Sequence, residues 1–365
     1  MIDLRSVRLA AEGLRALGSV YGKRRRPLFV NHLITVRCNL ACPFCYVSGP
    51  EQQAFNGERY PKSAELNTAE LRDFYRQLVD LRFKLLVIVG GEPLLRTDLD
   101  DVLRAVDDRL YVSVFTNGLV LADRHELLRR AHSVFVSLDA PDEQHDRLRA
   151  RPGCFDRAVA GIAAARRHQH HLKLSLMMTV TDQNVERVGD MLAFARELRL
   201  PIGFQPPSYD GQFALEGRPT AEAEQRMPPS HSVTEAFRQI RSAARHQPVL
   251  GSRAFHQLII DGKPFFRCQY PWYVLGPVLP NGDVVACTTS QVMASLRDTT
   301  VEQLLTAPEF QRNAAAGPHC ERGCRDWGIF DVSALHNAEL GLADVRQYYR
   351  TFLRGAGRIG ACESL

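Results

Sequence analysis

TVRCNLACPFCY, residues 35–46, places three cysteines on a short loop directly after an apolar stretch at residues 28–35. The cysteines are Cys38, Cys42 and Cys45, in the spacing C-x3-C-x2-C. Three thiolates on one tight loop can each bind one iron of a [4Fe–4S] cube and leave the fourth iron without a protein ligand. A structural zinc site needs four ligands, commonly in paired C-x2-C spacing. The loop therefore favours an iron–sulfur site over zinc.

Alternating apolar and helical patterns follow this loop. Apolar segments predict strands at residues 28–35, 85–89, 111–116, 133–138, 173–180 and 201–205. Apolar residues at helical spacing predict helices at residues 3–20, 68–81, 98–109, 123–131, 154–168, 185–198 and 232–246. Strands with near-continuous apolar runs are typical of parallel sheets buried on both faces. The chain is therefore an α/β protein, either doubly wound or barrel-like.

The pattern changes after the sixth predicted strand. Residues 206–229 carry no clear periodicity and are interpreted as a loop near the mouth of the sheet. From about residue 251 we expect short strands and turns, because Pro280-Asn281-Gly282-Asp283 is a strong hairpin signal between residues 273–279 and 284–287. The expected division is an N-terminal helix with a basic linker, a parallel-sheet domain and a small C-terminal α+β domain, at residues 1–27, 28–250 and 251–365.

Composition excludes several classes of protein. The 365 residues are 45% hydrophobic and 24% charged, which argues against whole-chain disorder or coiled coil. The net charge of +5 is spread along the chain, so we expect no nucleic-acid partner. No run approaches the roughly 18 apolar residues of a membrane span, and residues 1–20 carry charges that a signal peptide would lack. We therefore expect a cytoplasmic protein with no membrane association.

Nine cysteines in such a chain indicate metal or redox chemistry rather than disulfides. A second group combines Cys268-x13-Gly282-x4-Cys287 with Cys320-x3-Cys324. Four thiolates suffice for one fully ligated [4Fe–4S] cluster, and zinc is a stronger competitor here than at the first loop. The remaining cysteines, Cys154 and Cys362, stand apart.

The first loop resembles that of the radical S-adenosylmethionine (SAM) enzymes, whose C-x3-C-x-aromatic-C pattern fits its cysteines and Phe44. The resemblance implies a partial (β/α)6 barrel in which SAM chelates the open iron. Reductive cleavage of SAM would then give methionine and a 5′-deoxyadenosyl radical. It also implies that Phe44 packs near the adenine and that the Tyr46 backbone meets the adenine edge.

Three further segments at predicted strand ends resemble motifs of this family. Gly90-Gly91-Glu92-Pro93 looks like its GGEP motif, with Glu92 suited to the SAM ammonium group. The resemblance implies that Asn117, Ser137 and Asp139 meet the SAM carboxylate and ribose. Arg149, in a stretch similar to the family's H-D-x-x-R motif, would pair with the SAM carboxylate in a bidentate fork.

The second cysteine group resembles the family's shortened accessory module, the twitch form of the SPASM domain. This implies one auxiliary [4Fe–4S] cluster bound by Cys268, Cys287, Cys320 and Cys324. The full SPASM form needs more cysteines after residue 324, where only Cys362 remains, so we expect no second auxiliary cluster. The resemblance covers residues 28 to about 330.

The expected function is hydrogen abstraction from an unactivated carbon of a polar small molecule, such as a sugar, aminocyclitol or nucleoside intermediate. Only 27 residues precede the first predicted strand, too few for the fused peptide-recognition domain of many peptide-modifying relatives. Modification of a peptide presented by a separate partner remains an alternative, as does a non-enzymatic zinc-binding protein. The expected electron donor is a flavodoxin or ferredoxin.

Candidate substrate contacts follow the sixth strand, because barrel active sites lie at the C-terminal ends of strands; they are Gln205, Tyr209 and Asp210. The favoured outcome is oxidation of the substrate radical, which needs no positioned thiol. Epimerisation or decarboxylation is the alternative, with Cys154 or Cys362 as a possible hydrogen donor.

Overall fold

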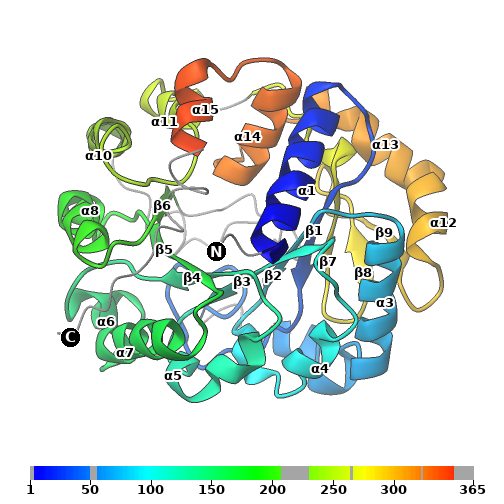
Figure 1. Cartoon of the computed structure of the whole chain (residues 1–365), viewed down its shortest axis with the longest axis horizontal. Coiled ribbons are helices and arrows are strands. Elements are labelled where there is room, and N and C mark those ends of the chain that lie inside the picture. Colours follow the sequence, from blue (N-terminus) through cyan, green and yellow to red (C-terminus); the bar gives the residue numbers. More distant parts are fainter. Residues whose placement is uncertain (1–3, 50–55, 207–229, 264–265, 322–323, 349–365) are drawn as a thin grey trace.

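The centre of the molecule is a curved, mostly parallel sheet (Figure 1). The computed structural model describes residues 4–49, 56–206, 230–263, 266–321 and 324–348. In these ranges the sheet has nine strands in the order β6-β5-β4-β3-β2-β1-β7-β8-β9. The strands are β1 (Phe29–Leu33), β2 (Leu85–Val89), β3 (Tyr111–Thr116), β4 (Ser133–Ser137), β5 (Lys173–Thr179), β6 (Ile202–Gln205), β7 (Val274–Val278), β8 (Asp283–Val285) and β9 (Val292–Ser295).

The sheet is an open barrel. Strands β1 to β7 pair in parallel, while β8 and β9 pair antiparallel at one edge. Strands β6 and β9 form the two ends of the sheet and do not pair with each other. The predicted α/β fold with a partial barrel of six β/α units is confirmed.

Helices follow the outer side of the curved sheet (Figure 1). The helices of the barrel are α3 (Thr68–Asp80), α4 (Leu99–Leu103), α5 (Leu121–Arg124), α6 (Gln144–Leu148), α7 (Cys154–His168), α8 (Val188–Glu197) and α10 (Ser230–Ala243). The others are α1 (Leu4–Tyr21), α11 (Arg253–Ile260), α12 (Val301–Thr306), α13 (Pro308–Ala316), α14 (Trp327–His336) and α15 (Leu342–Tyr348).

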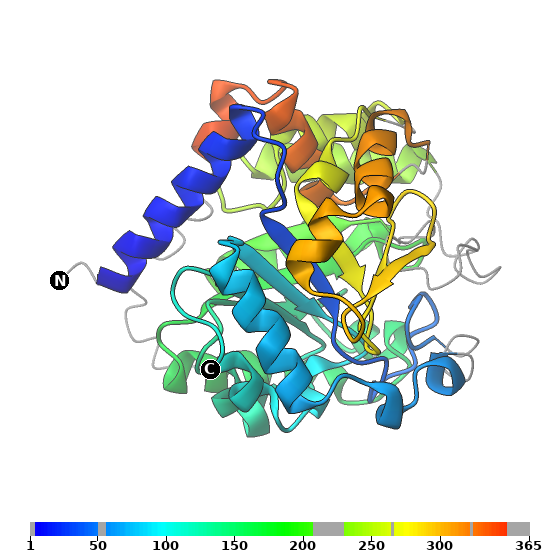
Figure 2. The same ribbon diagram turned by 90° about the vertical axis from the view of Figure 1, so that its right-hand side faces the viewer.

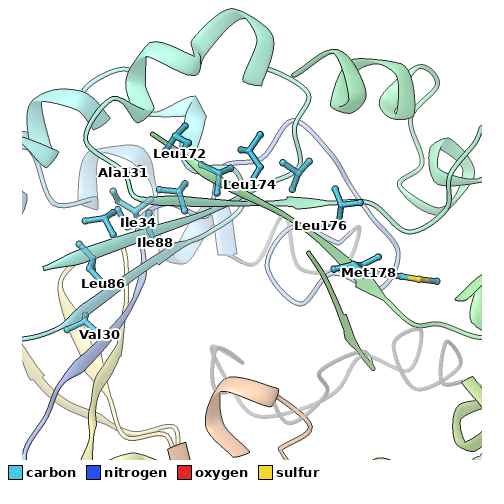
Figure 3. Packing of buried hydrophobic residues seen from close by; sticks show 14 of the residues in the cluster. Val30, Ile34, Leu86, Ile88, Ala131, Leu172, Leu174, Leu176 and Met178 are labelled. Atoms are coloured by element: carbon cyan, nitrogen blue, oxygen red, sulfur yellow. The ribbon is translucent and has the colours of Figure 1, made fainter. Parts of the chain in front are cut away.

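The core lies between the sheet and these helices. On β2, Leu86 and Ile88 are fully buried, whereas the alternate residues Leu85, Val87 and Val89 are half-buried on the inner face. The same alternation on neighbouring strands collects apolar side chains on the helix side (Figure 3), among them Val30, Leu174, Leu176 and Met178. Burial of this continuous layer is the main stabilising contribution to the barrel.

Two predicted helices are shorter than expected. The helix predicted at residues 98–109 ends at Leu103, and Asp107 then organises a turn by accepting a hydrogen bond from the Arg109 backbone N–H at 2.8 Å. The helix predicted at residues 123–131 is α5 followed by a 3-10 turn at His125–Leu128. Local side-chain and i→i+3 hydrogen bonds end both helices early.

The C-terminal region is more helical than expected. Helix α11 occupies residues where short strands and turns were predicted, because Ser252 caps it by accepting a hydrogen bond from the Phe255 N–H at 2.9 Å. Strand β7, the first strand of the predicted hairpin, also pairs with β1 of the barrel. The sheet therefore runs across the expected boundary at residue 250, and the division into domains stays a prediction.

Helix α1 lies along one side of the molecule against α14 (Figure 2). Its contact is formed by Ala16 and Val20, which pack near Val332 and Leu335. No helix in the described ranges combines the length and the apolar character needed to cross a bilayer.

Replacing Leu86 by alanine is expected to lower the free energy of unfolding by about 2–5 kcal/mol, because the substitution leaves a cavity in the layer behind β2. Leu14 on α1 is 69% exposed, so Leu14→Ala is the control and should change stability by less than about 0.5 kcal/mol. Urea unfolding of both variants measures the difference. Equal midpoints would contradict the placement of Leu86 in the core.

Candidate metal and cofactor site

The sequence motifs meet at the C-terminal ends of β1 to β4. The first cysteine loop follows β1, Gly90–Glu92 follow β2, Asn117 follows β3, and Asp139 follows β4. Parallel strands bring their carboxyl ends to one edge of a sheet, which is where barrel enzymes place their sites.

The first cysteine loop is folded around its own sulfur atoms. The Leu40 N–H donates to Cys38 Sγ at 3.4 Å, and the N–H groups of Val47 and Ser48 donate to Cys45 Sγ at 3.4 Å. Burial raises the pKa of Cys42 to about 12. A buried thiolate needs a positive charge beside it; Arg149 supplies one, and bound iron would supply another.

Three thiolates on one loop are the donor set that a [4Fe–4S] cube with one open iron requires. Within the described ranges, no three Cys, His, Asp or Glu side chains are arranged to hold a metal ion. A cube binds each thiolate through a different iron, so its ligands need not converge on one point as the ligands of a single zinc ion do. The assignment of Cys38, Cys42 and Cys45 as ligands stays a prediction.

Gly90 and Gly91 pack directly on the backbone that leads into this loop. A Cβ atom on Gly91 would lie 2.4 Å from the Arg37 carbonyl oxygen, and one on Gly90 would lie 2.5 Å from the Thr35 carbonyl oxygen. The Gly91 N–H donates to Thr35 O and the Glu92 N–H donates to Arg37 O, both at 2.8 Å. Only glycine allows this approach of two backbones.

Glu92 is fully buried and connects β2 to β3. Its carboxylate accepts hydrogen bonds from Leu94 N at 3.0 Å, Thr116 Oγ1 at 2.8 Å and Asn117 N at 2.7 Å. Burial raises the pKa of Glu92 to about 7, while the three donors oppose this shift. Glu92 therefore fixes the end of β3, and its role toward SAM stays a prediction.

Asn117 ties β3 to the cysteine loop. Its Nδ2 donates to Asn39 Oδ1 at 2.8 Å and lies 3.8 Å from Cys38 Sγ. Its Oδ1 accepts from the Leu119 N–H at 3.0 Å. The amide is thus held beside the first cysteine.

Asp139 and Arg149 form a buried ion pair, with Arg149 Nε 2.5 Å from Asp139 Oδ2. The other carboxylate oxygen accepts from the Thr179 N–H at 2.9 Å, so Asp139 is engaged by the protein on both oxygens. Burial lowers the pKa of Arg149, but Asp139 and Cys42 raise it, and the net value lies above the usual range. Arg149 lies over the Phe44 ring at 5.3 Å and 3.9 Å from Cys42 Sγ.

Two other predicted residues near this site are described. Ser137 is half-buried at the end of β4. Cys154 begins α7 and packs in one apolar cluster with Leu40, Cys42 and Leu119, beside the cysteine loop. Burial raises the pKa of Cys154 to about 11. A role for Cys154 as a hydrogen donor stays a prediction, and Cys362 lies outside the described residues.

The second cysteine group lies around Tyr270. Cys268 and Cys324 border the apolar cluster that Tyr270 forms with Val274 and Ile329. Burial raises the pKa of Cys268 to about 11, and Cys320 adds to the shift. Burial raises the pKa of Tyr270, and the charges of Cys287 and Cys268 raise it further. All four cysteines are half-buried, and their role as cluster ligands stays a prediction.

Sequence reasoning named Gln205 at the end of the sixth strand but missed its partner, Asp326. Asp326 caps α14 and also accepts a hydrogen bond from the side chain of Gln205, the last residue of β6. Burial raises the pKa of Tyr46 in the first cysteine loop, and the charges of Cys45 and Asp326 raise it further. An aspartate directly before an apolar helix signals a cap, but nothing local shows that it meets β6. The predicted contacts Tyr209 and Asp210 lie outside the described residues.

Aromatic side chains of β3 and β4 pack against each other in a second apolar cluster of the sheet. Phe115 and Phe135 stack with ring centroids 4.5 Å apart. Met177, Leu250 and Trp327 pack in the same cluster. The sheet therefore carries an apolar cluster on β3, β4 and β5, while Gln205 and Asp326 place polar groups at the end of β6.

Comparisons with known proteins agree with this geometry. The chain is 31% identical over 177 residues to AdoMet-dependent heme synthase of Methanosarcina barkeri, covering 47% of this chain and 48% of that protein. It is 35% identical over 148 residues to a probable GTP 3′,8-cyclase of Methanocella arvoryzae, covering 40% and 45%. The chain thus matches about half the length of these curated relatives.

Solved structures share the fold at low sequence identity. Streptococcus suis SuiB bound to S-adenosylmethionine gives a TM-score of 0.60 at 16% identity, covering 80% of this chain and 68% of SuiB. Native anSMEcpe with bound AdoMet gives 0.57 at 14% identity, covering 91% and 100%. A family model described as the Radical SAM superfamily matches residues 33–195, the part of the chain that carries the first cysteine loop and the ends of β1 to β4. Residues 33–195 of this chain are therefore a Radical SAM domain.

Proposed function

We propose that the protein cleaves SAM reductively and abstracts a hydrogen atom from a polar small molecule of the sugar, aminocyclitol or nucleoside type, which it then oxidises. The observation that carries the proposal is the meeting of the C-x3-C-x2-C loop with Gly90–Glu92, Asn117 and Arg149 at one edge of the sheet. When bound, the cluster and SAM supply a 5′-deoxyadenosyl radical.

The chain's own residues hold and orient SAM in this proposal. Arg149 is kept charged by Asp139 and directed toward Cys42, which suits it to the SAM carboxylate. Phe44, against the same guanidinium, offers an aromatic face for the adenine. Glu92 and Asn117 supply a carboxylate and an amide for the amino-acid end of SAM. Ser137 and the Tyr46 backbone would meet the ribose and adenine edge.

The mouth of the barrel suits a substrate with hydroxyl or amine groups. Asp326 accepts hydrogen bonds, and Gln205 can both donate and accept. Both are half-buried and close to Tyr46, so a substrate held by them would lie near the first cysteine loop. Tyr209 and Asp210 remain proposed contacts. The similarity to GTP 3′,8-cyclases, whose name specifies a nucleotide substrate, is consistent with this class.

A peptide substrate is the second candidate. The solved structures with a shared fold include SuiB bound to the precursor peptide SuiA and anSMEcpe with the Cp18Cys peptide. These likenesses concern the fold, and the peptide would be presented to this chain by a partner. The GTP 3′,8-cyclase similarity, which rests on higher sequence identity, favours the small molecule.

The second cysteine group supports oxidation as the outcome. A cluster held by Cys268, Cys287, Cys320 and Cys324 has no open iron and therefore transfers electrons rather than binding substrate. It would accept the second electron from the substrate radical, while a flavodoxin or ferredoxin would supply the electron for SAM cleavage. Epimerisation and decarboxylation are the alternative outcomes, and a zinc-binding protein without catalysis is the alternative function.

Replacing Cys42 by alanine should abolish 5′-deoxyadenosine formation, because one iron of the first cube loses its thiolate. The protein is reconstituted and assayed without oxygen in the presence of dithionite, and iron is counted per chain. About eight irons are expected in the wild type and about four in the variant.

The control is Cys154→Ala, which removes a buried thiol next to the same loop but outside the proposed ligand set. It should retain about eight irons and SAM cleavage. SAM cleavage that survives Cys42→Ala would refute the assignment, and wild-type protein that binds only zinc would favour the non-enzymatic alternative.

Once a substrate is identified, deuterium at the abstracted position should appear once in 5′-deoxyadenosine, and the product should have lost two electrons. Mass spectrometry of both products measures this. A redox-neutral product that contains solvent hydrogen, and that is lost on replacing Cys154 or Cys362, would show epimerisation instead.

A further inference from the structure

Glu65 is a buried carboxylate between two segments of the proposed SAM site. It lies in the connection that precedes α3, and its side chain is only 4% exposed. No sequence motif marks this residue. Its contacts reach the first cysteine loop on one side and the segment after Gly90–Glu92 on the other.

On the first side, Glu65 holds the residues that immediately precede Cys38. Its Oε1 accepts hydrogen bonds from Thr35 Oγ1 and from Arg37 Nε, the latter at 3.3 Å. Its Oε2 accepts from Arg37 Nη2 at 3.2 Å. Glu65 thus binds the side chains of Thr35 and Arg37. The backbone carbonyls of these two residues accept the hydrogen bonds from the Gly91 and Glu92 N–H groups.

On the second side, Glu65 meets Arg96, which lies four residues after Glu92. Arg96 Nη1 is 3.4 Å from Glu65 Oε2, and the Arg96 side chain is only 6% exposed. Asp98 accepts two further hydrogen bonds from this guanidinium, at 3.1 and 2.8 Å. The Leu66 carbonyl accepts two more, at 3.1 Å each.

We propose that Glu65 is a positioning residue for SAM: with Arg37 and Arg96 it locks the cysteine loop to the Gly90–Glu92 segment. This inference rests on the proposed function. In the proposed site, the cysteine loop binds the cluster and the Gly90–Glu92 segment contacts the amino-acid end of SAM. One carboxylate between two guanidiniums fixes their separation, and small displacements of binding groups are costly in such sites.

The charge of Glu65 is the essential property. In Glu65→Gln, an amide NH2 replaces an acceptor oxygen and faces the N–H donors of the two arginines. Arg37 then loses the carboxylate of Glu65, and Arg96 keeps only that of Asp98 in a place too buried for water to compensate. The expected relief is a shift of Thr35–Arg37 away from Gly91, which separates the two halves of the SAM site.

The test measures SAM binding to full-length, iron-loaded protein under anaerobic conditions by equilibrium dialysis. Glu65→Gln should raise the dissociation constant of SAM about tenfold or more, and it should weaken the change that SAM induces in the EPR spectrum of the reduced first cluster. Glu309→Gln is the matched control, because its ion pair with Arg312 is exposed and lies within α13. It should leave both readouts unchanged.

Arg37→Gln is the second variant, since the Arg37 side chain is 34% exposed and its loss buries no unpaired charge. It should also raise the dissociation constant of SAM. In the double variant, the loss of binding free energy should be smaller than the sum of the losses in the two single variants. This keeps the proposal testable if Glu65→Gln folds poorly.

Three outcomes would overturn the proposal. SAM affinity equal to wild type in both iron-loaded variants would show that Glu65 does not position the site. Additive effects in the double variant would remove the coupling. Loss of iron from both variants, with normal loading of Glu309→Gln, would make the role purely structural. Wild-type protein that loads iron but binds no SAM would instead refute the proposed function itself.

Discussion

Close backbone packing between two strand ends governs the rest of this site. Gly90 and Gly91 lie so near the carbonyl groups of Thr35–Arg37 that a Cβ atom would collide with them. This contact fixes the cysteine loop relative to β2, and the next residue, Glu92, extends the connection to β3. At the end of β3, Asn117 donates a hydrogen bond to Asn39 in the cysteine loop, so the loop, β2 and β3 are each connected to the other two.

Two buried arginines belong to this network, Arg149 beside Cys42 and Arg96 beside Glu65, and carboxylates compensate the charge of each. Arg149 is matched by Asp139, and Arg96 is matched by Glu65 and Asp98. Ion pairs of this kind contribute little net stability relative to apolar packing, since desolvation offsets their attraction. What they provide is a fixed direction for each guanidinium, because a buried charge cannot move away from its partner.

Local patterns predicted the barrel strands well because each strand carries its own apolar signal, as Leu86 and Ile88 do on β2. The site followed from that, since parallel strands bring motifs at their ends to one edge. The rest depends on contacts between distant segments. The sequence around Glu65 does not indicate its contact with Arg96, and the sequence around Asp326 does not indicate its contact with Gln205. Helix α11 was missed although Phe255, Leu258 and Ile259 lie at helical spacing, because the helix has only eight residues and the pattern is correspondingly short.

The pairing of β1 with β7 has a consequence for how the chain acquires its structure. Phe29 lies opposite Val274, so one edge of β1 pairs with a segment 245 residues later in the sequence (274 − 29). Contacts of such high sequence separation form slowly, because a long loop must close before they form. During synthesis, β1 can pair with β2 long before β7 leaves the ribosome. Until then its other edge presents unpaired N–H and C=O groups, the feature that promotes association between incomplete chains.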